Sequence, residues 1–405
     1  MEKINELNNE RKLATITKIL DIQPIPDADN IEKIFVRGWQ CIARKGEYKV
    51  GDLCIYIEID SILPDGLSIE KQEEWRALNK QMSKAESEEQ RDLLRAQMAE
   101  ISKLNIRPEF EFLRAVKFHV KTRKILGEIS QGICFPLSIF NNTEIWAEDD
   151  NVTDILGVTQ YIAPDPATMG GNAAGMLTGV GLLITDEERI ENLSSKYEAL
   201  KQFTYYKTEK LDGTSCTVYL KAGRFGVCGR TIDFQVPDEN DAWDAMNVYW
   251  KVAKKFKLET KMRKMAIEYD INDFALQGEI VGEGVQGNIY KLKGQQVCFY
   301  NAFDIGLQEY WNFEAFINLL KDTESGLHTV PILEDNYTLP ETAKELLEEA
   351  DKTTTVFGNN PNQLIEGFVY VARETIPATV RITRSSFGRL SFKAKSRTFD
   401  MLKGK

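Results

Sequence analysis

The chain has 405 residues, which is room for two or three domains of roughly 100–200 residues each. Hydrophobic residues make up 42% and charged residues 28%, a balance that is typical of globular proteins and excludes a mainly disordered chain. No apolar run approaches the roughly 20 residues that cross a bilayer, and the polar start matches neither a signal peptide nor a transit peptide. The net charge of −11 argues against a general nucleic-acid coat but allows a local basic channel.

Six widely spaced cysteines without a CxxC pair favour buried thiols over disulfides or a zinc site. We therefore expect a cytoplasmic protein, located in the host cytoplasm if its source is viral. The only histidines, His119 and His328, exclude a His-rich metal cluster, and neither lies in a recognisable nucleophile context. Any catalysis is expected to rest on Lys, Arg, Asp and Glu side chains.

Short β-branched or alternating runs separated by turn residues fill the first part of the chain. They predict a small β-barrel or sandwich in residues 1–164. The expected strands are residues 13–22, 31–36, 39–43, 53–59, 113–120 and 132–136.

A charged insertion at residues 68–104 interrupts these strands. Between residues 70 and 100, 14 of 31 residues are charged, and Trp75, Leu78 and Met82 share one helical face. The pattern predicts a helix or helical hairpin packed on the barrel. Its charged face is either simply solvated or a clamp for nucleic acid.

Residues 165–183 are rich in small residues and are expected to form a linker or mobile loop, or else to pack as apolar structure. Thr185 to Glu188 resembles a capping box, which predicts a helix over residues 186–200. The second domain is expected at residues 184–405, with mixed strands and helices. It includes one long amphipathic helix, residues 243–269, whose basic residues form a solvated face or a phosphate-facing stripe.

A Lys-x-Asp-Gly segment, Lys210 to Gly213, lies between two strand-like runs. A lysine becomes a nucleophile when its pKa is lowered, and a glycine permits close approach of the backbone to a phosphate. Taken alone, the segment also fits an ordinary surface β-turn.

Further charges occur inside apolar strands downstream. Glu279 and Glu366 each interrupt an apolar run, where a charge is costly unless it is paired or binds a metal. Lys393 and Lys395, at a spacing of two, share one face of a strand and would repel each other unless an anion lies between them. Arg230 is a further cation at a strand end. Each of these alone fits an edge-strand charge.

Together and in this order, these residues resemble the motifs of the covalent nucleotidyltransferase superfamily of ATP-dependent ligases and capping enzymes. The resemblance implies that Lys210 forms a lysyl–nucleotide bond. It assigns catalysis to Lys210, Lys393 and Lys395, and metal binding to Asp212, Glu279 and Glu366. It assigns nucleotide binding to Glu209, Asp212, Gly213, Arg230, Glu279, Phe299, Glu366, Lys393 and Lys395, with Phe299 expected to stack on the base.

Ten residues follow Lys395, which leaves no room there for the C-terminal OB domain of DNA ligases and capping enzymes. The small β-domain comes first instead, an order that resembles the Naegleria and Deinococcus type of RNA ligase. The implied fold is α+β: an N-terminal OB-like β-barrel, then a nucleotidyltransferase domain of antiparallel sheets and helices.

The implied activity is that of an ATP-dependent RNA ligase. It joins 3′-OH and 5′-phosphate RNA ends, at nicks, through lysyl–AMP and RNA–adenylate. ATP and Mg²⁺ (or Mn²⁺) are the implied cofactors, RNA is the partner, and a monomer without membrane contact is expected. Lys393 and Lys395 are expected to help lower the pKa of Lys210. A DNA ligase or RNA guanylyltransferase on the same scaffold, or a non-catalytic RNA-binding OB protein, remains an alternative.

A basic stretch alternates with apolar residues in the first domain and is expected to form one face of a barrel strand. That face would bind the RNA backbone or orient the pyrophosphate of ATP. Its members are Arg114, Lys117, Lys121, Arg123 and Lys124.

Overall fold

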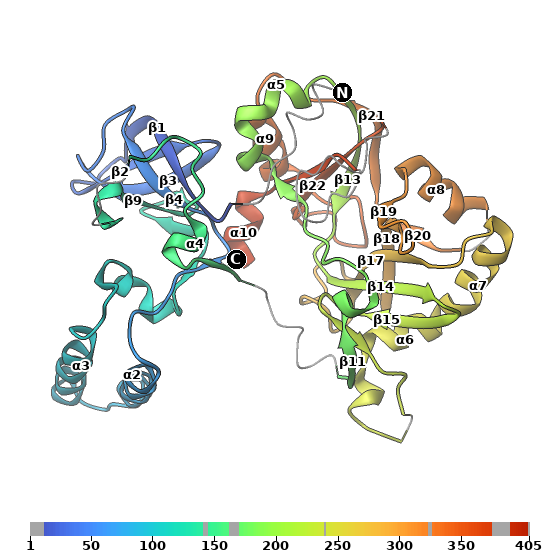
Figure 1. The fold of residues 1–405 in the computed structure, drawn as a ribbon, viewed down its shortest axis with the longest axis horizontal. Coiled ribbons are helices and arrows are strands. Elements are labelled where there is room, and N and C mark those ends of the chain that lie inside the picture. Colours follow the sequence, from blue (N-terminus) through green and yellow to red (C-terminus); the bar gives the residue numbers. More distant parts are fainter. Residues whose placement is uncertain are drawn as a thin grey trace. The chain divides into compact units, whose positions relative to one another are not determined.

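The computed structural model describes residues 12–140, 145–161, 170–238, 240–322, 326–374 and 389–403. The chain forms two compact units, Lys12–Ile162 and a second unit that includes Ala163–Lys405 (Figure 1).

The first unit is built on a five-stranded antiparallel sheet in the order β3-β2-β1-β4-β9. Strand β1 pairs with β2 through one end and with β4 through the other, and its register shifts between Ile19 and Asp21. Such a bulge bends a strand, so that one strand can serve both sides of a barrel. The strands are β1 (Ala14–Pro24), β2 (Ile31–Val36), β3 (Trp39–Arg44), β4 (Leu53–Ile57) and β9 (Ile133–Pro136).

Short strands and turns complete this unit around two apolar cores. Strands β10, β5 and β6 form a three-stranded sheet, and β7 and β8 form a hairpin. Their bounds are β5 (Ser61–Ile62), β6 (His119–Val120), β7 (Arg123–Ile125), β8 (Glu128–Ser130) and β10 (Thr159–Gln160); the helices are α4 (Thr153–Leu156), η1 (Pro108–Val116) and η2 (Leu137–Phe140).

The insertion is a helical hairpin, as predicted, formed by α2 (Ile69–Met82) and α3 (Glu88–Ser102). Ser68 and Ser87 cap the two helices by accepting hydrogen bonds from Lys71 N and Gln90 N. Only the end of α3 is buried, through Met98 and Ile101. The hairpin is therefore an amphipathic arm attached at its base.

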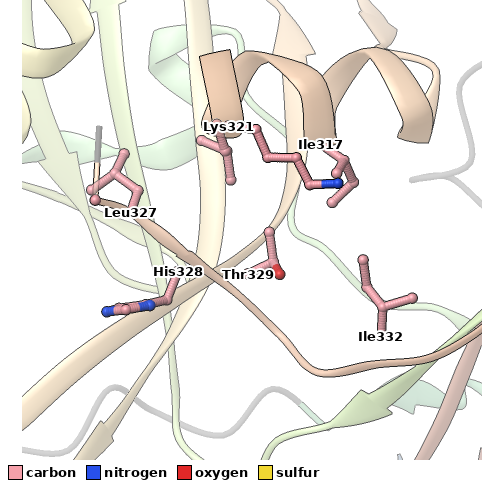
Figure 2. Close-up of a pocket in the computed structure, with 8 residues that line it drawn as sticks. Ile317, Lys321, Leu327, His328, Thr329 and Ile332 are labelled. Atoms are coloured by element: carbon pink, nitrogen blue, oxygen red, sulfur yellow. The ribbon is translucent and has the colours of Figure 1, made fainter. Parts of the chain in front are cut away.

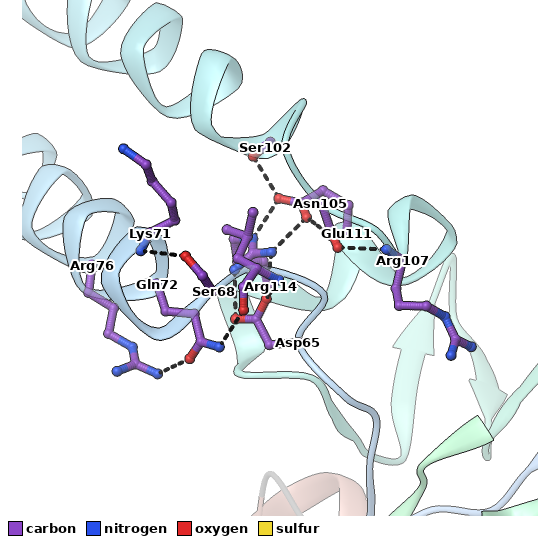
Figure 3. Close-up of polar contacts among 11 residues, drawn as sticks. Asp65, Ser68, Lys71, Gln72, Arg76, Ser102, Asn105, Arg107, Glu111 and Arg114 are labelled. Carbon is purple, nitrogen blue, oxygen red and sulfur yellow. Dashed lines mark hydrogen bonds and ion pairs between the residues drawn. The ribbon is translucent and has the colours of Figure 1, made fainter. Parts of the chain in front are cut away.

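Arg114 anchors that base (Figure 3). Its guanidinium binds Asp65 through two hydrogen bonds of 2.8 Å and Glu111 through hydrogen bonds of 2.6 and 2.8 Å. Glu111 in turn accepts from Ser102 at the end of α3, at 2.7 Å. The side chain of Arg114 is 5% exposed.

The expectation of a strand over residues 113–120 with Arg114 on a basic face is therefore wrong. Its first half belongs to η1, and only His119 and Val120 form a strand. Arg114 points to two half-buried carboxylates outside the segment, Asp65 and Glu111, rather than to a basic face. Lys121, Arg123 and Lys124 remain exposed, on or next to the β7–β8 hairpin.

The second unit contains two sheets. The larger has the order β11-β16-β15-β14-β17-β18-β19, with β20 pairing to β18, and the smaller has the order β12-β23-β22-β13-β21. The larger sheet consists of β11 (Ala173–Met176), β14 (Thr214–Lys221), β15 (Arg224–Cys228), β16 (Ile232–Phe234), β17 (Phe274–Gly282), β18 (Gln295–Asp304), β19 (Glu309–Tyr310) and β20 (His328–Thr329). The smaller consists of β12 (Glu188–Arg189), β13 (Thr204–Lys210), β21 (Ile332–Thr338), β22 (Gly367–Ala372) and β23 (Ser391–Lys395).

Helices cover both sheets through separate apolar cores. One core joins the larger sheet to α6 (Val248–Lys255), α7 (Leu258–Tyr269) and α8 (Phe313–Asp322). Another joins the smaller sheet to η5 (Ile190–Lys196), α5 (Tyr197–Leu200) and α9 (Ala343–Lys352). The remaining helices are η4 (Leu177–Val180), η6 (Asp244–Met246) and α10 (Arg397–Lys403).

Three expectations for this unit differ from the structure. Residues 173–180, expected as part of a linker, form β11 and η4; Leu177 and Val180 are buried in a core, which agrees with the alternative that this stretch packs as apolar structure. The helix expected over residues 186–200 is instead β12, η5 and α5, because Glu188 and Arg189 pair with β23. The helix expected over residues 243–269 is broken at Lys257, whose φ is 51°.

Candidate functional site

The Lys-x-Asp-Gly segment is the crossover between the two sheets. Lys210 is the last residue of β13 in the smaller sheet, and β14 of the larger sheet begins at Thr214. A β-carbon on Gly213 would collide with the carbonyl oxygen of Ile280 on β17. The glycine therefore lets the crossover lie directly against the larger sheet.

Lys210 contacts a carboxylate rather than open solvent. Its Nζ donates a 2.7 Å hydrogen bond to Oε2 of Glu366, and its side chain is 28% exposed. Strand pairing explains the contact, since Lys210 lies opposite Gly367, the residue after Glu366. Gly367 also has no room for a β-carbon, which would meet the carbonyl oxygen of Ala394.

The two C-terminal lysines share one face of β23, as predicted. Lys395 Nζ lies 3.2 Å from Oε1 of Glu366 and 2.8 Å from Oδ1 of Asp400. Lys393 Nζ lies 2.7 Å from Oδ1 of Asp186. Glu366 thus bridges Lys210 and Lys395, while Lys393 is held by a separate carboxylate.

Glu279 brings the larger sheet into the site. It lies on β17, and its Oε1 accepts a 3.1 Å hydrogen bond from the backbone N–H of Gly213. Burial, together with the nearby charges of Glu366 and Asp212 and despite Lys210, raises the pKa of Glu279 to about 8. We call Lys210, Asp212, Glu279, Glu366 and Lys395 the lysine–carboxylate cluster.

The cluster holds Lys210 in its charged form. Burial by itself would lower the pKa of Lys210, but the negative charges of Glu366, Glu279 and Asp212 outweigh it and raise the pKa above its ordinary value. This differs from the expectation that the neighbouring lysines lower this pKa. The carboxylates are closer to the amine than that expectation assumed.

Asp212 has partners that the sequence did not reveal. Its backbone N–H donates a 2.7 Å hydrogen bond to the hydroxyl of Tyr290, and its Oδ2 lies 2.9 Å from Nζ of Lys403 on α10. Its side chain is 3% exposed. Asp212 is therefore fixed both through its backbone and through its charge.

Asp212, Glu279 and Glu366 have the oxygen ligands that Mg²⁺ and Mn²⁺ prefer. Among the described residues, however, no three His, Cys, Asp or Glu side chains converge closely enough to hold an ion alone. The three carboxylates consequently fit an ion that keeps several of its waters, a mode typical of Mg²⁺.

Family models match parts of both units of the chain. Residues 203–395 match a family model described as RNA ligase, and residues 13–100 match an OB-fold domain model. No curated protein sequence matches the chain.

Solved structures match over nearly the whole chain. A mutant of the Naegleria gruberi RNA ligase without ligand is 30% identical, with a TM-score of 0.71, covering 98% of this chain and 99% of that one. The same enzyme with pyrophosphate has 30% identity and a TM-score of 0.70, covering 97% and 98%. A mutant with ATP and Mn has 30% identity and a TM-score of 0.70, covering 96% and 98%.

The chain belongs to the RNA ligase family. Its first unit is an OB-fold barrel, and its second is the α+β nucleotidyltransferase-like domain predicted from the motif order.

Two predicted site residues of this RNA ligase lie apart from the cluster. Glu209 points to the opposite face of β13 from Lys210, and its carboxylate accepts hydrogen bonds from Thr355 Oγ1 and Val356 N. Phe299 is fully buried in the core beneath helices α6–α8, so its ring is not available to a base.

Tyr300, the next residue on β18, lies on the other face. Its hydroxyl is within 3.2 Å of Thr185 Oγ1, and Glu279 contributes to the rise of its pKa, after burial. Tyr300 is therefore the aromatic side chain that this strand offers to the site. The register shift between Gln277 and Gly278, which the sequence does not show, helps to set which of the two aromatics faces inward.

Arg230 lies in the turn between β15 and β16. Residue Cys228, two positions earlier, pairs with Thr217 of β14, so this turn is at the same end of the sheet as Gly213 and Thr214. The structure thus places Arg230 at the edge of the sheet where the cluster lies.

A separate pocket of about 360 Å³ lies between α8 and β20 (Figure 2). Ile317, Leu320, Leu327 and His328 are among its lining residues, and no member of the lysine–carboxylate cluster is. No helix in the described ranges is long and apolar enough to cross a bilayer.

Proposed function

We propose that this protein is an ATP-dependent RNA ligase that joins a 3′-hydroxyl to a 5′-phosphate at nicks, with Lys210 as the nucleophile. The observation that carries the proposal is the placement of Lys210. Its side chain is partly exposed, and its amine is hydrogen-bonded to Glu366 and feels the charges of the two further carboxylates, Glu279 and Asp212. The similar Naegleria gruberi enzyme, solved with ATP and Mn, supports the same cofactors here.

In the first step, the Nζ of Lys210 attacks the α-phosphorus of ATP. The new N–P bond forms as the bond from the α-phosphorus to the bridging oxygen breaks, and pyrophosphate leaves. Because the raised pKa keeps Lys210 protonated near neutral pH, a proton must first leave the amine. Glu366 Oε2, at 2.7 Å, is within reach to accept it.

The AMP then passes to the 5′-phosphate of RNA, and a 3′-hydroxyl displaces AMP to seal the strand. Lys395 and Lys393 are placed to stabilise the phosphate oxygens, since an ammonium is a compact donor of three hydrogen bonds. Their present partners, Glu366, Asp400 and Asp186, hold the two amines until a phosphate binds.

Asp212, Glu279 and Glu366 would hold Mg²⁺ or Mn²⁺ through water. When bound, the ion supplies positive charge that neutralises phosphate oxygens. The carboxylates would supply the negative charge that attracts it, and Glu279, whose pKa is raised to about 8 by burial and by the nearby charges of Glu366 and Asp212, must lose its proton to contribute.

The exposed residues Lys117, Lys121, Arg123 and Lys124 are proposed to bind the RNA backbone or, alternatively, the pyrophosphate of ATP. Replacing Lys121, Arg123 and Lys124 by alanine separates the two roles. Lost sealing with intact self-adenylylation supports RNA binding, and loss of both supports pyrophosphate binding. As a matched control, replacing Arg76 and Lys80 of α2 and Lys84 just after it, all three exposed, by alanine should leave both activities intact.

All six cysteines are free thiols, which supports the proposed cytoplasmic location. We also propose that the protein acts as a monomer.

Incubation with α-labelled ATP and Mg²⁺ tests the central proposal. The wild-type protein should form a covalent AMP adduct, and Lys210→Ala should form none. Labelling that survives in Lys210→Ala would contradict the assignment. Nicked duplexes with RNA or DNA on either side of the break then distinguish an RNA ligase from a DNA ligase, and labelled GTP tests for a guanylyltransferase.

A further inference from the structure

Helix α10 reaches the lysine–carboxylate cluster through two side chains on one face, Asp400 and Lys403. Asp400 contacts Lys395, and Lys403 contacts Asp212. Residues three apart on a helix are neighbours, so one short helix contacts both the smaller sheet and the crossover between the sheets.

Lys395 is fixed between two carboxylates. Its Nζ lies 2.8 Å from Asp400 Oδ1 and 3.2 Å from Glu366 Oε1. Both contacts are ion pairs, which place the ammonium between two negative charges. An ammonium carries three N–H donors from which a phosphate oxygen can accept, and the two carboxylates fix where that ammonium lies.

Asp400 is itself held rigidly. Its side chain is 2% exposed, and α10 begins with a hydrogen bond from Phe399 N to Ser396 Oγ at 3.1 Å. Arg397 binds Asp351 of α9 through two hydrogen bonds of 2.6 and 2.9 Å. Its Oδ2 also lies 3.7 Å from Nη2 of the buried Arg189, so Asp400 offsets the charge of two cations.

Because Glu366 contacts both Lys210 and Lys395, a shift of Lys395 would also change the contact between Glu366 and the nucleophile. Glu366 uses Oε2 for Lys210 and Oε1 for Lys395. With Asp400 in place, Lys395 is shared with a second anion. Without it, Lys395 would depend on Glu366 alone and would draw that carboxylate away from Lys210.

We propose that Asp400 is a positioning residue, which acts through Lys395 to aim its ammonium at the phosphate and to keep Glu366 available to Lys210. The inference rests on the proposed function, because it requires Lys395 to act in nucleotidyl transfer.

The test is a double-mutant cycle on Asp400→Asn and Lys395→Ala, measured as the single-turnover rate of lysyl–AMP formation at saturating ATP. Asp400→Asn alone should lower this rate about 10- to 100-fold, the range expected for a misplaced catalytic group. The ATP concentration for half-maximal rate should change less than the rate. In the Lys395→Ala background, Asp400→Asn should have no further effect.

A second readout compares two parameters within Asp400→Asn itself. A misplaced ammonium lowers the saturated rate, whereas a general loosening of the nucleotide site also raises the ATP concentration for half-maximal rate. This comparison remains available if Lys395→Ala is too slow to measure.

Asp233→Asn is the matched control. Asp233 is also a buried aspartate, with 3% of its side chain exposed, and it pairs with Arg224 at 3.0 Å outside the cluster. It should leave the rate unchanged. An Asp400→Asn effect that adds to that of Lys395→Ala, or a half-maximal ATP concentration that rises as much as the rate falls, would overturn the inference. If the Lys210→Ala protein is still labelled, the proposed function fails instead, so the two failures are distinguishable.

Discussion

Glu366 accepts a hydrogen bond from the amine of Lys210 through one oxygen and forms an ion pair with Lys395 through the other. One carboxylate thus sets the charge state of the nucleophile and the position of a phosphate-binding lysine. The predictions below follow from this shared contact and from the packing around it.

Glu366→Gln should slow lysyl–AMP formation by about 10²–10³-fold, a typical cost of removing one preorganised electrostatic group. The same change should lower the pKa of Lys210, because Glu366 is the strongest of the charges that raise it. A slower reaction with its rising limb at lower pH is therefore expected in a rate–pH profile. A slower reaction with an unshifted profile would show that Glu366 does not control the amine.

The first step should accelerate as pH rises from 7 to 9. Glu279, with a pKa of about 8, must lose its proton to attract a cation, and Lys210 must also lose one. Below pH 8, the apparent Mn²⁺ affinity should fall up to about tenfold per pH unit, as displacement of one proton requires. Calorimetry in two buffers of different ionisation enthalpy measures that proton release. No release at pH 7 would contradict the prediction.

Glu279→Gln should stabilise the metal-free protein at pH 9. A carboxyl whose folded pKa is raised binds its proton more tightly in the folded state, so the free energy of unfolding falls as pH rises from about 4.5 to about 8. The glutamine amide does not ionise, so the free energy of unfolding no longer falls over this pH range. Each kcal/mol by which that free energy is higher should raise the Tm by about 2–4 °C. Little difference is expected at pH 4, where Glu279 is protonated in both states.

Lys393→Arg should be a poor substitute, with lysyl–AMP formation reduced about 10²-fold. A planar guanidinium does not reproduce the compact ammonium that lies 2.7 Å from Asp186. Single-turnover labelling measures the loss. Unchanged labelling and sealing would count against a contact between Lys393 and phosphate.

Gly367→Ala should inactivate the protein, because its β-carbon would collide with the backbone of β23 beside Lys395. Gly175→Ala is the control, since a β-carbon there meets nothing within 4 Å. Labelling and thermal denaturation of both variants give the comparison. A Gly367→Ala protein of full activity would show that β22 and β23 can separate without harm.

The sequence predicted the parts of the site that depend on strand alternation. Spacing by two put Lys393 and Lys395 on one face, and apolar runs placed Glu279 and Glu366 on strands or at their ends. It could not predict contacts between distant segments. Nothing local shows that Arg114 binds Asp65 or that α10 returns to Asp212, and a one-residue register shift exchanges the roles of Phe299 and Tyr300.

The same limit applies to the helices. The capping-box pattern at Thr185 does not begin a helix. Asp186 and Glu187 are used by Lys393 and Arg389, and the chain that follows pairs with β23 instead of coiling. The local preference for a helix was overridden by contacts of Asp186 and Glu187 with residues more than 200 positions away in the sequence.

The crossover that carries Lys210 has a mechanical consequence. Glu366 precedes a strand of one sheet and Glu279 lies on the other, while Leu211 to Gly213 tether the two. A ligand bound by both carboxylates therefore links the two sheets, so its binding should make the second unit as a whole more resistant to thermal unfolding. That gain in stability should grow with the logarithm of the ligand concentration.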